Sequence, residues 1–172
     1  LAPQITPAAV IPASRAGAGA PEGGVYEVSP AATALAEEIA RLIAGHGGAA
    51  LLLDYGYGEA GFGETLQAVG RHRFAGLLEE PGTKDLSAHV DFAALAEAAR
   101  HGGAAVYGPQ PQGALLEALG IETRAGQLAK VNPAEAEAVR AAARRLTAPD
   151  EMGTLFQGLA LMPPSAARPP GF

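Results

Sequence analysis

The sequence predicts an α/β protein built on a small, mostly parallel β-sheet with helices on both faces. Helical patterns alternate along the chain with short, wholly apolar runs such as Ala49–Leu53, which are typical of strands buried on both faces. The chain has 172 residues, and 48% of them are hydrophobic, enough for one domain with a sizeable core. A parallel sheet of only three or four strands leaves an edge that needs covering, so the pattern indicates half of a doubly wound domain.

The N-terminal region predicts a flexible linker or loop followed by a helix. Residues 1–24 contain four prolines and many glycines, which forbid a continuous helix, and they are interpreted as a linker or loop. A short strand is expected over 25–28. Ser29 and Pro30 have the residue types preferred at the N-cap and the first helical position, so a helix is predicted over 30–44.

After the strand at 49–53, residues 54–88 predict a loop with little regular structure, containing at most one helical turn at 65–69. So long a loop in a compact domain is usually functional or mobile. The apolar spacing then predicts a helix over 91–101, capped by Asp91 or the residue before it, and a strand over 104–107.

The C-terminal third predicts two more helices and a last strand. One short helix is expected over 114–119, and a longer one starts at Asn132-Pro133. The apolar residues of 152–162 predict the last strand. Three parts are therefore expected: a linker at 1–24, a domain at 25–165, and an extended tail at 166–172.

Composition and charge exclude several classes of function. A formal net charge of −6 argues against a nucleic-acid footprint and against binding to an anionic membrane surface. There is no cysteine, which excludes disulfides and thiolate metal sites. The apolar runs are far shorter than the ~20 residues that span a bilayer, and the N-terminus lacks a signal-peptide pattern. A cytoplasmic location is therefore expected, and because the first residue is not Met, the chain is expected to begin inside a longer reading frame.

A phosphate-binding loop is the first candidate site, and the sequence disfavours it. Gly56-Tyr57-Gly58 follows a predicted strand, as such loops do, but no helix starts soon after it. Glu59 and Glu64 would also repel an anion.

A metal site and a hydrolase triad are likewise disfavoured. His72, His89 and Asp91 are the only reasonable metal-ligand set, and a local hydrogen bond or capping role for His89 is favoured instead. Ser87, His89 and Asp91 are neighbours in sequence, whereas triads are assembled from separate elements. The chain has no Gly-x-Ser-x-Gly elbow either.

Eight segments stand out when they are taken together and in this order along the chain. They lie at 25–30, 53–56, 64–68, 71–74, 81–82, 85–92, 111–113 and 152–156, of which the run Asp-Leu-Ser-Ala-His-Val-Asp-Phe at 85–92 is the most specific. Together they resemble the C-terminal half of one known family, the MidA-like class I S-adenosylmethionine-dependent methyltransferases, over about residues 20–165. This family includes the mitochondrial arginine methyltransferase that assists assembly of respiratory complex I. The Ala- and Gly-rich composition looks alphaproteobacterial.

The resemblance implies a particular fold. It implies the C-terminal half of a Rossmann-like methyltransferase sheet, mostly parallel, in which the last strand is antiparallel. The strands at 49–53 and 104–107 are then expected to be parallel and adjacent or separated by one strand, with the strand at 152–162 antiparallel to them.

The resemblance also implies the cofactor S-adenosylmethionine, which the family holds with a Glu-x-Gly-x-Gly turn. The residues Glu59-Ala60-Gly61-Phe62-Gly63 have this spacing, but the family's own turn, and the strand that carries it, are expected upstream of this chain. The chain is therefore expected to be inactive alone and not to bind the methyl donor measurably.

Position and residue type indicate the candidate catalytic residues, which are His89, Asp91, Asp54 and Tyr55. A carboxylate can hold a substrate guanidinium, an aromatic ring can stack on it, and a histidine can take a proton. We expect all four at the carboxyl end of the sheet, facing one cleft. The implied partners are a protein substrate, with a complex I subunit suggested by the resemblance, and a second copy in a homodimer. Two alternatives stay open: a non-catalytic interaction fragment and a small-molecule methyltransferase.

Overall fold

The computed structural model describes residues 22–172, which form two compact units. The larger unit contains residues 30–59 and 90–172. The smaller unit contains residues 60–89 together with the described residues 22–29. The chain thus enters the larger unit, leaves it after residue 59, and returns to it at residue 90.

A four-stranded sheet forms the centre of the larger unit. Its order is β5 (Val90–Asp91), β1 (Ala50–Tyr57), β7 (Phe156–Met162) and β6 (Ala105–Pro111). β1 is parallel to β5, whereas β7 is antiparallel to both β1 and β6. β1 and β6 therefore run in the same direction with one strand between them, and the predicted arrangement of these strands is confirmed.

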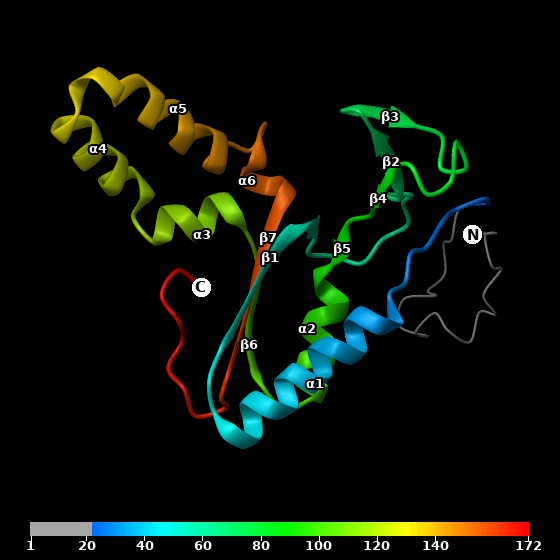
Figure 1. The fold of residues 1–172 in the computed structure, drawn as a ribbon. Coiled ribbons are helices and arrows are strands. Elements are labelled where there is room, and N and C mark those ends of the chain that lie inside the picture. Colours follow the sequence, from blue (N-terminus) through cyan, green and yellow to red (C-terminus); the bar gives the residue numbers. More distant parts are fainter. Residues whose placement is uncertain (1–21) are drawn as a thin grey trace. The chain divides into compact units, whose positions relative to one another are not determined.

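Two helices pack on one face of this sheet and form the core with it (Figure 1). They are α1 (Pro30–His46) and α2 (Phe92–His101). Alanines at the helix contact allow the two helices to approach closely, and the largest side chains sealed inside are Phe92, Leu159 and Leu161. The core is small and rich in alanine, as the composition predicts.

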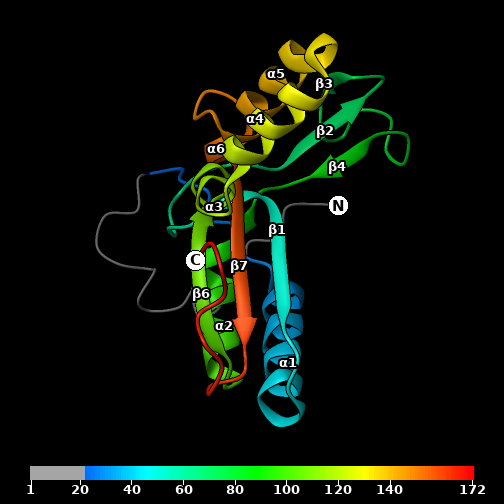
Figure 2. The same cartoon turned by 90° about the vertical axis from the view of Figure 1, so that its left-hand side faces the viewer.

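The C-terminal tail lies over the opposite face, and a helical arm follows β6 beyond the end of the strands (Figure 2). Gln110 Nε2 donates a hydrogen bond of 2.9 Å to the carbonyl oxygen of Gly171, which ties the tail to β6. The arm consists of α3 (Gln112–Ala118), α4 (Ile121–Val131), a 3₁₀ turn at Pro133–Glu135, α5 (Ala136–Thr147) and the short α6 (Met152–Leu155).

The smaller unit contains a three-stranded antiparallel sheet, so the prediction of an irregular loop over 54–88 is wrong. Its order is β3 (Arg73–Ala75), β2 (Gln67–Gly70) and β4 (Asp85–Ser87). These strands have three or four residues each, too few to show a period-two pattern in the sequence. The helical turn suggested at 65–69 is also wrong, because most of those residues belong to β2.

Further differences from the sequence prediction are local. Residues 25–28 are not a strand; Val25 instead accepts a hydrogen bond of 2.9 Å from Gly63 N, and the ring of Tyr26 packs edge-on against Phe62. β6 continues to Pro111 because a register shift between Tyr107 and Gln110 accommodates the intervening Gly-Pro. α6 occupies the start of the segment predicted as the last strand, and α4 was not predicted. None of the helices in the described part is long and apolar enough to cross a membrane.

Candidate functional site

The carboxyl end of β1 holds the first two candidate residues, Asp54 and Tyr55. Asp54 is exposed, and its Oδ1 accepts a 2.8 Å hydrogen bond from the backbone N–H of Tyr55. The Tyr55 ring packs edge-on against Phe156 of β7, with ring centroids 6.0 Å apart. Successive residues of a strand point to opposite faces of the sheet. β1 therefore does not bring the Asp54 and Tyr55 side chains together.

Asp91 lies at the same end of the sheet, on the short strand β5. The register of β5 on β1 places Val90 beside Gly56 and Asp91 beside Tyr57. Asp91 is the N-cap of α2, because its Oδ1 accepts a 2.8 Å hydrogen bond from Ala94 N. The predicted cap is confirmed, and Asp91 and Tyr57 become neighbours that the sequence did not single out as a pair.

His89 is the last residue of the smaller unit and is held there by its backbone. Its N–H donates a 2.9 Å hydrogen bond to Thr65 Oγ1. Thr65 Oγ1 in turn donates to a carboxylate oxygen of Glu27. The other oxygen of Glu27 accepts from the backbone N–H groups of Thr65 and Leu66, at 2.8 and 3.0 Å.

Glu27 and Thr65 therefore position the segment that ends at His89. Neither of them is among the residues predicted to form the site. The two are 38 positions apart. No spacing rule connects residues so far apart, and the only signal was that both lie in motifs of the family resemblance. The convergence of all four candidate residues on one cleft stays a prediction, because His89 belongs to one unit and the other three to the other.

The glycines at the end of β1 are explained by packing. A Cβ at Gly56 would lie 2.2 Å from the carbonyl oxygen of Val90, so glycine is required for β5 to approach β1. A Cβ at Gly58 would lie 3.3 Å from Pro109. The described residues contain no cluster of three or more side chains that could hold a metal ion.

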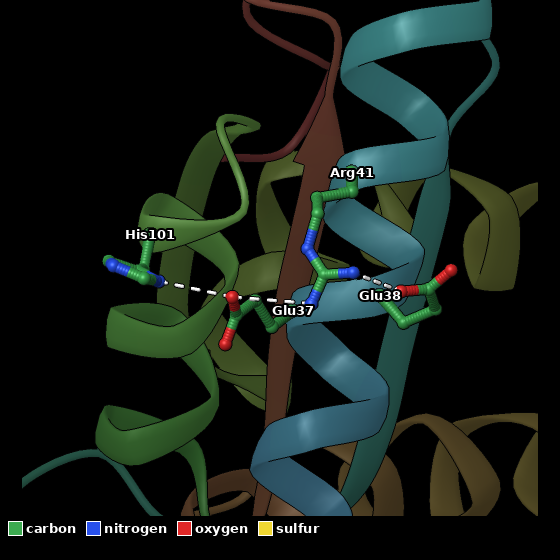
Figure 3. Close-up of polar contacts among 4 residues, drawn as sticks. All are labelled: Glu37, Glu38, Arg41 and His101. Atoms are coloured by element: carbon green, nitrogen blue, oxygen red, sulfur yellow. Dashed lines mark hydrogen bonds and ion pairs between the residues drawn. The ribbon is translucent and has the colours of Figure 1, made fainter.

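A second group of charged side chains lies at the other end of the helices and is structural (Figure 3). Glu37 Oε1 of α1 is 3.1 Å from His101 Nδ1 of α2 and 3.3 Å from Arg41. Hydrogen bonding to His101, and then to Arg41, lowers the pKa of Glu37. His101 ends α2, whereas Asp91 begins it, so this group ties the two helices together away from the end of β1.

Comparison with known proteins identifies the family. The model of a family of S-adenosyl-L-methionine-dependent methyltransferases matches residues 2–110. The chain is 40% identical over 134 residues to the protein arginine methyltransferase NDUFAF7 homolog of Drosophila melanogaster, covering 75% of this chain and 29% of that protein. It is 37% identical over 139 residues to human NDUFAF7, covering 80% and 31%.

A solved structure shares the fold of this chain. It comes from Burkholderia thailandensis and contains bound S-adenosyl-homocysteine. It is 30% identical to this chain with a TM-score of 0.79, and the match covers 93% of this chain and 43% of that one. The chain spans about three tenths of the length of the two arginine methyltransferase relatives. With more than half of its residues matched by the family model, it belongs to the MidA-like family of S-adenosyl-L-methionine-dependent methyltransferases.

Proposed function

We propose that this chain is the C-terminal portion of a protein-arginine methyltransferase that acts on a subunit of respiratory complex I. The observation that carries the proposal is the similarity to relatives named protein arginine methyltransferases, at 37 and 40% identity over at least three quarters of the chain. The complex I subunit comes from the family resemblance in the sequence. The donor is S-adenosylmethionine, held by the part of the enzyme that this chain does not span.

The end of β1 is the part of this chain that would contact the substrate. In open α/β sheets, ligands bind beyond the carboxyl ends of the strands. Asp91 stands beside Tyr57 there, and a carboxylate next to an aromatic ring suits a guanidinium, which accepts both charge pairing and stacking. Asp54 and Tyr55 lie inside β1, two or three residues before its end, with side chains on its two faces. We propose His89 as the group that orients an acid or takes a proton.

The test is methyl transfer by the complete protein. The whole open reading frame is expressed and incubated with radiolabelled S-adenosylmethionine and arginine peptides from complex I subunits. Label on arginine, lost when the arginine is replaced by lysine, supports the proposal. Label that appears only on small metabolites would instead establish a small-molecule methyltransferase of the same fold.

A non-catalytic role for the chain by itself is the second candidate, and it is supported by the chain's coverage of only about three tenths of its curated relatives. Calorimetric titration of the 172-residue chain with S-adenosylmethionine separates the two readings. We expect no measurable heat of binding. Micromolar affinity would show that the donor site lies within this chain, and it would contradict our placement of that site.

A further inference from the structure

The hairpin of β2 and β3 turns in a conformation that its residues do not favour. Gly70 pairs with Arg73, so Arg71 and His72 form a two-residue turn, and their φ angles are +52° and +61°. Turns of this kind usually carry Asn-Gly, because most L-residues adopt positive φ only with strain. A surface turn whose residues do not suit its backbone conformation is typical of a position where the side chains serve a function.

β3 presents an open edge. It is the outer strand of the order β3-β2-β4, and none of the described strands pairs with its other side. The closing pair of a two-residue hairpin exchanges both hydrogen bonds, and the next pair exchanges none. The next pair here is Val69 and Phe74, so the N–H and C=O groups of Phe74 point away from β2, toward the open edge.

The side chains at this edge combine two arginines with an exposed aromatic ring. Phe74 is 81% exposed. Arg71 and Arg73 are exposed and have no ion-pair partner among residues 22–172, whereas the nearby Lys84 is neutralised by Glu80 at 2.8 Å. Arg71, Arg73 and Phe74 line an open depression of about 470 Å³, together with Lys84 and one acidic residue, Glu79. Because strand residues alternate, Arg73 and Phe74 lie on opposite faces of the edge.

The smaller unit is inserted into the chain at the carboxyl end of β1. The chain leaves the larger unit after β1 and re-enters it at β5, and Tyr57 and Asp91 are register neighbours. Both ends of the insert are therefore anchored at the carboxyl end of β1, where ligands bind in open α/β sheets.

We propose that the edge of β3 docks an extended segment of the protein substrate by strand addition, and that this segment alternates acidic and apolar residues. The inference rests on the proposed function for the identity of the partner. Carboxylates of the segment pair with Arg71 and Arg73, and an apolar residue packs on Phe74. The backbone groups of Phe74 supply hydrogen bonds to the added strand.

A binding experiment on the 172-residue chain tests this without cofactor or catalysis. The probe is a fluorescein-labelled peptide, Gly-Asp-Val-Asp-Val-Asp-Gly, followed by fluorescence anisotropy at low ionic strength. The same peptide with lysine in place of aspartate should not bind. Arg71→Glu/Arg73→Glu should weaken binding about tenfold or more, because two charge-assisted contacts are lost. Phe74→Ser should also weaken it.

The matched control is Arg140→Glu/Arg145→Glu, which makes the same change of charge on two exposed arginines of α5. It should leave the affinity unchanged. Arg71→Gln/Arg73→Gln removes the charges without reversing them, and it should weaken binding even if the Glu variant misfolds. Equal loss in the α5 control, equal binding of the lysine peptide, or unchanged affinity in the Gln variant overturns the proposal. Methyl transfer by the complete protein is measured separately, so failure of docking and failure of the arginine methyltransferase assignment are distinguishable.

Discussion

The hydroxyl group of Thr65 joins two chain segments of the smaller unit. It accepts from His89 N and donates to Glu27. Thr65→Val keeps the branched shape but leaves a part-buried N–H and a carboxylate oxygen without this partner, and we expect a loss of about 1–3 kcal/mol in stability. Hydrogen exchange at the His89 amide should become faster.

Thr83 provides the control for this change. Its hydroxyl donates to the carbonyl oxygen of Glu80, three residues earlier, in an exposed turn. Thr83→Val should leave the exchange rate of the His89 amide unchanged. An equal effect of both variants would show that Thr65 has no special role in holding the segment.

Asp91 combines a structural role with a proposed catalytic one, and two substitutions separate them. Asp91→Asn keeps an oxygen for Ala94 N, and asparagine caps helices as well as aspartate, so stability should hardly change. Asp91→Ala should cost about 0.5–2 kcal/mol in urea unfolding. In the complete enzyme both variants should lower kcat. Wild-type methylation by Asp91→Asn would limit Asp91 to capping.

Some of the roles of single residues can be predicted from the sequence, and others cannot. The capping role of Asp91 was predictable because an N-cap depends on the next three residues only. The hydrogen bonds of Glu27 were not predictable, because they connect positions that approach only when the smaller unit folds. The opposite orientation of Asp54 and Tyr55 follows from the alternation of side chains along a strand.

At the scale of elements, Glu37 links α1 to α2 in a way that depends on pH. Its folded-state pKa lies below the ordinary value of 4.5 because it accepts hydrogen bonds from His101 and Arg41. The carboxylate therefore contributes stability that is fully present above about pH 4.5 and is lost as the pH falls through the lowered folded-state pKa. Glu37→Gln should flatten this part of the acid-unfolding curve, followed by circular dichroism.

Glu117 offers a comparison, since it is an exposed glutamate of another helix, α3, and does not link α1 to α2. Glu117→Gln should retain the wild-type acid dependence. An unchanged acid-unfolding curve of Glu37→Gln would show that Glu37 does not make the contact between α1 and α2 depend on pH.

Elements with a strong local pattern were predictable, and short polar ones were not. The buried run of β1 and the apolar spacing of α2 are visible in the sequence. β2, β3 and β4 gain their strand conformation from one another, since none is long enough to show a pattern of its own. β7 was located correctly, but its position between β1 and β6 came from the family resemblance rather than from its residues.

At the scale of the whole molecule, the outer edge of β1 is exposed and apolar. β5 pairs only with Gly56 and Tyr57, so residues 50–54 have no described strand beside that edge. Leu51 and Leu53 are about half exposed. Open apolar edges pair with other chains. We therefore expect the isolated chain to self-associate, and Leu53→Lys should shift it toward monomer in sedimentation velocity.

Leu128→Lys serves as the matched substitution, because Leu128 is a partly exposed leucine on α4. It should leave self-association unchanged. A monomeric wild-type chain, or the same shift in both variants, would contradict the role of the β1 edge.

The order of strands in the sheet has a consequence for synthesis on the ribosome. β7 lies between β1 and β6 in space but follows both in the chain, behind the whole helical arm. Until β7 has left the exit tunnel, β1 and β6 have no strand to join them, and their apolar residues stay open to solvent or to chaperones. A premature stop before residue 156 would therefore remove the middle of the sheet rather than its margin, and nascent chains of this length should be bound by chaperones until the last strand emerges.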